Sequence, residues 1–126
     1  MARLKTPLVG VLAILTLLAV AAAAAISVGA HRRSERIAAG RKVFFSTCAG
    51  CHGKDARGGK GFPVDLRSGP FVRANSDARL VDFIERGRPK TDPSNRTHFS
   101  MPPKGGNPDL SREDLAAVVA YLRSLG

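Results

Sequence analysis

The fold of this chain is decided by the stretch Cys48-Ala49-Gly50-Cys51-His52. In a helical turn, residues i, i+3 and i+4 share one face, so both thiols and the imidazole point to the same side. Two cysteines and a histidine in this order are the attachment sequence of a c-type haem. The small residues between the cysteines let a porphyrin edge approach the backbone. We expect thioether bonds from both cysteines and iron ligation by His52.

Three other uses of the cysteine pair stay open at this point. A thioredoxin-type redox pair needs a βαβ setting, which the sequence does not show. A zinc site lacks a second cysteine pair, and only the histidines His31, His52 and His98 are available to complete it. The third use is a structural disulfide. The adjacent histidine, the apolar leading segment and the helical layout favour haem attachment over all three.

Met101 is the candidate for the second iron ligand. Apart from Met1 it is the sole methionine, and it lies in Ser100-Met101-Pro102-Pro103. Thioether sulfur is a soft ligand for haem iron, and the two prolines keep the following backbone extended. A methionine filling a core gap is the ordinary alternative, but this loop is polar and rich in proline. His98 is the rival ligand.

The sequence predicts three main helices joined by loops. They are expected from Ser34 through the cysteine motif, from Ser76 to Gly87, and from Ser111 to the end, where Asp114 completes a capping box with Ser111. Stretches 53–70 and 88–108 are rich in glycine and proline, which indicates loops. No segment alternates as a strand does, so we expect an all-α fold. Apolar residues form one stripe on each helix: Ile37, Gly40, Phe44 and Cys48; Leu80, Phe83 and Ile84; Leu115, Val118, Val119, Leu122 and Leu125.

The first thirty residues form a segment apart from the expected haem domain at 31–126. Residues 8–30 carry no charge, and as a helix they would reach about 34 Å, enough to span a hydrocarbon core of about 30 Å. Two interpretations remain: a retained membrane anchor, or a signal peptide cleaved within its alanine-rich second half. In both, the domain is exported. It would lie on the periplasmic side of a bacterial inner membrane, anchored there or free in the periplasm.

The charge of residues 31–126 is strongly basic, with 18 Lys and Arg against 10 Asp and Glu. Such a balance suits an anionic membrane surface or an acidic protein partner. Nucleic acid is not an expected partner, because the basic residues are scattered and no aromatic-rich basic stretch accompanies them. Basic residues near the motif and near Met101 are Lys54, Arg57, Lys60 and Lys104, and we expect them to face a redox partner with an acidic docking patch.

Residues 36–126 resemble the class I (mitochondrial-type) cytochrome c family in its small bacterial form. The resemblance rests on residues 48–53, on Met101-Pro102 and on the closing helix, residues 115–125. It implies a small all-α fold with three main helices and loops wrapped around one covalently bound haem. Stretch 88–100 has no family counterpart.

The resemblance also assigns positions inside the fold. The family's first and last helices cross, and Gly40 and Phe44 correspond to the first helix of that crossing, with Val118 and Tyr121 on the last. Pro63 matches the family's loop proline, whose carbonyl or its neighbour's accepts the other N–H of the ligand imidazole.

The function expected from these residues is one-electron transfer in a periplasmic respiratory or oxidative chain. Two protein ligands leave iron no open coordination site, so we expect a carrier and not an enzyme. One alternative is a haem subunit that feeds a dehydrogenase or oxidase complex. Another is a peroxidase-like or gas-binding protein, although His98 is the sole candidate for distal acid-base chemistry and no residue pairs with it.

Overall fold

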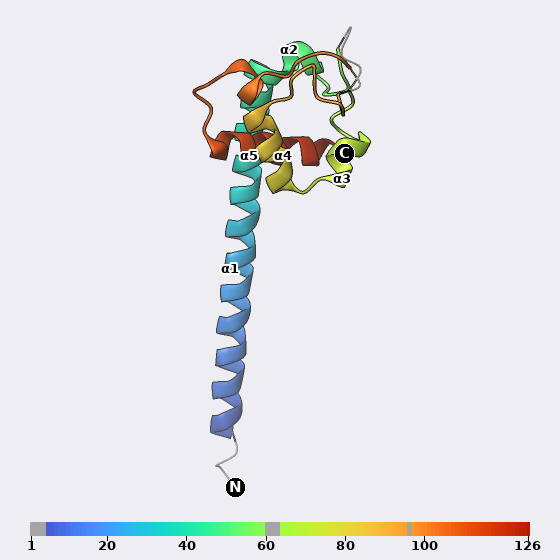
Figure 1. The fold of residues 1–126 in the computed structure, drawn as a ribbon. Coiled ribbons are helices and arrows are strands. Elements are labelled where there is room, and N and C mark those ends of the chain that lie inside the picture. Colours follow the sequence, from blue (N-terminus) through green and yellow to red (C-terminus); the bar gives the residue numbers. More distant parts are fainter. Residues whose placement is uncertain (1–4, 60–63, 96) are drawn as a thin grey trace. The chain divides into compact units, whose positions relative to one another are not determined.

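The computed structural model describes residues 5–59, 64–95 and 97–126, and the described part is helical (Figure 1). The described residues form no strand, and an isolated bridge joins Arg88 to Met101. The expected all-α class is therefore confirmed. In chain order the elements are α1 (Lys5–Val43), the π-helical turn η1 (Phe44–Cys48), α2 (Ala49–His52), α3 (Pro70–Ala74), α4 (Asp77–Arg86), the 3-10 turn η2 (Pro103–Gly106) and α5 (Arg112–Leu125).

The chain divides into two compact units, Met1–Ser34 and Glu35–Gly126, and α1 contributes to both. The helix that we expected to begin near Ser34 is thus the end of a longer one, because neither glycine nor proline interrupts the chain there. In the first unit the apolar side chains are exposed from Val9 onward. With a window of mean hydropathy 2.7, this helix is long and apolar enough to cross a membrane. A signal sequence passes the same test.

In the second unit, the end of α1 crosses α5 at Gly40, as the family resemblance implied. A Cβ atom at Gly40 would lie 1.8 Å from the Ala117 carbonyl oxygen, so only hydrogen fits between the two backbones. One turn later, Phe44 is fully buried, and its ring centroid lies 5.4 Å from that of Tyr121. Val118 is buried in the same cluster. This crossing carries the cysteine motif, which begins four residues after Phe44.

A second buried cluster lies between α4 and α5. It consists of Val72, Leu80, Val81, Leu115 and Val119. Both helix starts are capped as predicted. The Ser76 hydroxyl accepts from the Arg79 N–H, and Ser111 forms the full capping box with Asp114. The Ser111 hydroxyl and N–H bind the Asp114 carboxylate and lower its pKa.

The short helix α3 was not predicted. It follows Gly69 with Pro70 at its first position, where a missing N–H costs nothing, and that proline is the signal that could have revealed it. Val72 of α3 belongs to the α4–α5 cluster. The loop assignment of 53–70 therefore holds up to Gly69 among its described residues.

Candidate functional site

The cysteine motif begins on a π-helical turn and ends on α2. The wider turn η1 interrupts the α-helix at Phe44–Cys48, a local change that recurs at functional sites. Cys48 is half-buried and packs against the Phe44 cluster, whereas Cys51 is exposed. Both thiols are free. Burial raises the pKa of the Cys48 thiol to about 11, so this thiol stays protonated at neutral pH.

The side chain of His52 contains a buried polar atom that has no hydrogen-bond partner. This atom is Nδ1, the sole such side-chain atom in the part of the chain that the structure describes. Burial also lowers the pKa of His52, which keeps the imidazole neutral at pH 7. Neutral imidazole is the form that binds iron.

The residue expected to satisfy Nδ1, Pro63, lies outside the described residues. The described start of the same loop folds back over the motif. The Gly58 N–H donates to the His52 carbonyl at 2.9 Å, and the Leu66 N–H donates to the Ala56 carbonyl at 2.8 Å. Ala56 is fully buried in the Phe44 cluster. The loop after His52 is thus attached to the same packed crossing that carries the motif.

Met101 is half-buried and paired with the end of α4. Its N–H donates to the Arg88 carbonyl, the Arg88 N–H donates to its carbonyl, and both N–O distances are 2.8 Å. The residue before Arg88 is Gly87, which ends α4 with φ +69°. A Cβ atom at Gly87 would lie 2.4 Å from the Met101 carbonyl oxygen, so glycine is required both for the backbone angle and for this close approach.

The turn that follows Met101 approaches the helix that carries the motif. Gly105, in η2, comes so close to η1 that a Cβ atom there would lie 3.1 Å from Cγ2 of Thr47. Thr47 directly precedes Cys48. In Figure 1 the orange stretch that contains η2 runs beside the green segment that leads into α2. The structure therefore brings Met101 and the motif, which are separated in sequence, to neighbouring segments.

Stretch 88–101 is organised from within by Asn95, which the sequence analysis gave no role. Asn95 is 5% exposed, and its side chain bonds to both limbs of the loop. Arg88, at the base, stacks on the rings of Phe71 and Phe83 and donates from Nε to Asp92 at 3.2 Å. A lone polar residue in a loop carries no sequence signal that distinguishes it from a solvated one.

His98, the rival ligand, is an exposed residue with φ +58° on the same loop. Lys54 and Arg57 are exposed after the motif. Lys104 donates from Nζ to the Pro108 carbonyl at 3.1 Å, and Lys60 lies outside the described residues. Within ranges 5–59, 64–95 and 97–126, no group of three or more His, Cys, Asp or Glu is placed to hold a metal ion.

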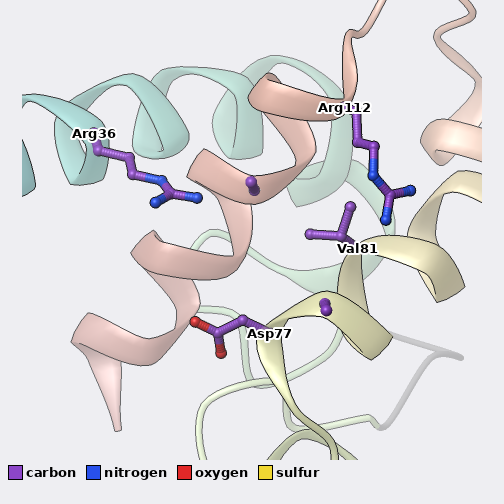
Figure 2. A pocket seen from close by; sticks show the side chains of 6 residues that line it. Arg36, Asp77, Val81 and Arg112 are labelled. Carbon is purple, nitrogen blue, oxygen red and sulfur yellow. The ribbon is translucent and has the colours of Figure 1, made fainter.

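A separate cleft of about 300 Å³ lies between α1, α4 and α5 (Figure 2). Arg36 and Asp77 reach toward it from α1 and α4, and Val81 of α4 also lines it. Two of its charged groups already have partners: Arg112 binds Asp82 and Glu85, and Asp77 accepts from Arg123. Neither the cysteine motif nor Met101 lines this cleft.

Comparison with known families identifies the domain. A family described as cytochrome C oxidase, cbb3-type, subunit III, matches residues 35–122, which include the motif, the buried crossing and Met101. The chain belongs to this cytochrome c family. Membership confirms the class I cytochrome resemblance and makes haem c the cofactor of the domain. The residues fit that group, because two free thiols, a neutral imidazole with one buried nitrogen and a thioether lie on neighbouring segments.

Curated relatives support the same family. A cbb3-type cytochrome c oxidase subunit CcoP from Rhodobacter capsulatus is 37% identical over 90 residues, which are 70% of this chain and 29% of the relative. A subunit FixP from Sinorhizobium medicae is 36% identical over 90 residues, or 71% of this chain and 30% of the relative. The chain thus spans about three tenths of the length of these relatives. No solved structure matches.

The N-terminal helix of this cytochrome fits an inner-membrane anchor. Family membership agrees with a domain exported to the periplasmic side and with electron transport as its role.

Proposed function

We propose that this cytochrome domain is a one-electron carrier with one covalently attached haem. Cys48 and Cys51 would form the thioethers, and His52 and Met101 would ligate the iron. The observation that carries the proposal is the approach of the η2 turn to Thr47, which brings the Met101 segment beside the motif. When bound, the haem would supply an iron that cycles between ferrous and ferric.

The chain's own residues would hold the group and set its properties. The buried Nδ1 of His52 needs a hydrogen-bond acceptor, and we propose the Pro63 carbonyl or its neighbour's for that role. Such a bond would fix the orientation of the His52 imidazole, which would hold the iron through its other nitrogen. The Met101 thioether, together with the imidazole, would raise the reduction potential and would leave the iron no open coordination site. A filled position favours a carrier over an enzyme.

Optical and NMR spectra of the purified protein, together with solvent extraction of the haem, test the attachment and the ligands. We expect a c-type pyridine haemochrome, no haem extracted by acidified organic solvent, and a strongly shifted methionine methyl in the paramagnetic NMR spectrum. Extraction of all the haem would contradict attachment through the cysteines. Bis-histidine features without the methyl signal would show that His98, and not Met101, is the second ligand.

As the cytochrome's partner we propose a redox protein with an acidic patch, within or beside an oxidase complex. The relatives are subunits of cbb3-type oxidases, and Lys54, Arg57 and Lys104 give this domain positive charge beside the motif and beside Met101. Opposite charges speed the encounter of two proteins, and salt weakens that attraction. Nucleic acid is not part of the proposal.

Rates of electron transfer to an acidic partner test this docking surface. We expect slower bimolecular transfer as salt rises, and slower transfer with less salt dependence after Lys54→Glu and Lys104→Glu. Arg79→Glu, on the exposed side of α4, is the matched control and should change the rate less. Equal effects of the three reversals would show that only total charge matters.

We propose that residues 8–30 stay in the mature protein as the membrane anchor, because their uncharged run exceeds the usual core of a signal peptide. Mass spectrometry of the mature N-terminus tests this. A start between Ala22 and His31 would show cleavage and a soluble periplasmic carrier.

A further inference from the structure

The loop Arg88–Met101 has one buried side chain among its described residues, and this side chain is polar. Asn95 is 5% exposed, whereas its described neighbours in the loop are half-buried or exposed. A buried amide costs free energy unless its donors and acceptors are paired. Its partners therefore indicate what it does.

All four hydrogen-bonding positions of the Asn95 side chain are used. Nδ2 donates to the Pro89 carbonyl at 3.1 Å and to the Phe99 carbonyl at 2.8 Å. Oδ1 accepts from the N–H of Thr97 at 3.1 Å and from its hydroxyl at 2.8 Å. These partners also fix the orientation of the amide, since two carbonyls require the NH₂ group and an N–H requires the oxygen.

The two carbonyls belong to opposite limbs of the loop. Pro89 follows Arg88 on the outgoing limb, and Phe99 precedes Met101 by two residues on the returning limb. The backbone bridge between Arg88 and Met101 closes the base. Asn95 ties the limbs together above that base. No apolar side chain of the described loop is buried. The hydrogen bonds of Asn95 therefore hold the loop in place, as apolar packing does for the helices.

We propose that Asn95 is the positioning residue that holds Met101 where its sulfur reaches the haem iron. The inference rests on the proposed function, in which Met101 is the second ligand. Without the two donors of Asn95, the limb from Phe99 to Met101 loses an attachment to the outgoing limb, while the base bridge and the bond from the Lys90 N–H to Ser100 Oγ, at 3.3 Å, remain. The sulfur then leaves the iron more often, although the helices that carry the haem thioethers are unchanged.

Variants of the holoprotein test this role. Asn95→Asp keeps the shape but replaces both donors with oxygen, which faces the carbonyls of Pro89 and Phe99, and Asn95→Ala removes the group. We measure the sulfur-to-iron charge-transfer band, the shifted methionine methyl and the rate of carbon monoxide binding to ferrous protein. We expect loss or weakening of both sulfur signals and carbon monoxide binding faster by at least about tenfold, since one net hydrogen bond is worth about that factor.

Two further variants keep the test decisive. Asn75→Ala is the matched control, because Asn75 also donates from Nδ2 to a carbonyl, that of Phe71 at 2.8 Å, but outside the loop. It should leave both sulfur signals unchanged. If the Asn95 variants yield no holoprotein, Thr97→Val is compared with Thr97→Ser, which keeps the hydroxyl donor to Asn95. The valine variant should bind carbon monoxide faster than the serine variant.

The outcomes separate the inference from the proposed function. Wild-type protein without the sulfur signals would overturn ligation by Met101 and the role of Asn95 together. Sulfur signals in the wild type that persist unchanged in both Asn95 variants would overturn the role of Asn95 alone. Equal effects of Asn95→Ala and Asn75→Ala, or of the two Thr97 variants, would overturn it as well.

Discussion

The two segments that carry the proposed iron ligands are held in opposite ways. The segment from Phe44 to His52 is continuous and helical, and it stands on a fully buried phenylalanine at a helix crossing. The loop from Arg88 to Met101 has no helix among its described residues. A backbone bridge closes it, and one buried amide supports it from within.

This difference follows from the sequence separation between the ligands that must be brought together. The two thiols and the imidazole need only one helical turn, so packing beneath that turn is sufficient. Met101 must be brought across the domain by a loop whose described residues bury little apolar area. Directional hydrogen bonds then replace packing, and such a segment opens more readily than a core helix. Four predictions test this contrast, in order of decreasing effect.

Removal of the haem should have the largest effect. In a protein with Cys48→Ala and Cys51→Ala, we expect a lower helical signal in circular dichroism, because a domain this small depends on its cofactor for a core. Residual hydrogen-exchange protection should lie in α4 and α5, and the amide of Met101 should exchange freely. Cys51→Ala alone, which keeps one thioether, is the control. Equal protection of the Met101 amide with and without haem would refute the contrast.

Phe44→Ala should destabilise the holoprotein by about 3–5 kcal/mol, because it removes a fully buried ring beneath the motif. Denaturant unfolding measures the change. The adjacent Phe45 is 39% exposed, so Phe45→Ala is the control and should cost less than about 1 kcal/mol. Similar costs for the two would mean that the motif does not depend on the buried ring.

Gly40→Ala should destabilise the protein by about 1–3 kcal/mol, since the new methyl meets the Ala117 carbonyl. The sign of the stability change is decisive, because alanine stabilises a helix by about 0.5–1 kcal/mol relative to glycine wherever its methyl group has room. Ala39→Gly, at the exposed neighbouring position, measures that propensity by itself. A rise in the melting temperature of Gly40→Ala would show that the helices do not cross there.

Ser111→Ala should have the smallest effect, about 1 kcal/mol, because it removes the cap of α5. The iron's spectrum should not change, since the cap lies neither on the motif nor on the Met101 loop. Ser111→Thr keeps a hydroxyl that accepts from the Asp114 N–H and donates to the Asp114 carboxylate, and it should be close to wild type in thermal unfolding. A changed methionine signal in Ser111→Ala would mean that the loop depends on α5 after all.

The helical framework was largely predictable. The caps at Ser76 and Ser111 and the stop at Gly87 are where the pattern indicated, because each depends on residues within one turn. Gly40 was expected at a helix crossing and is found there. The long α1, the π-turn and α3 were not anticipated. The haem ligands stay predictions.

Local sequence was sufficient to predict a haem c domain and the starts of α4 and α5, since the Cys48–His52 motif and the caps act through neighbours three or four residues away. The surroundings of Met101, in contrast, became known only from the tertiary structure. Its pairing with Arg88, the approach of Gly105 to Thr47 and the burial of Asn95 join segments that no local pattern connects. A polar residue in a loop has the same sequence signature in solvent and in a closed network, and only the fold distinguishes the two.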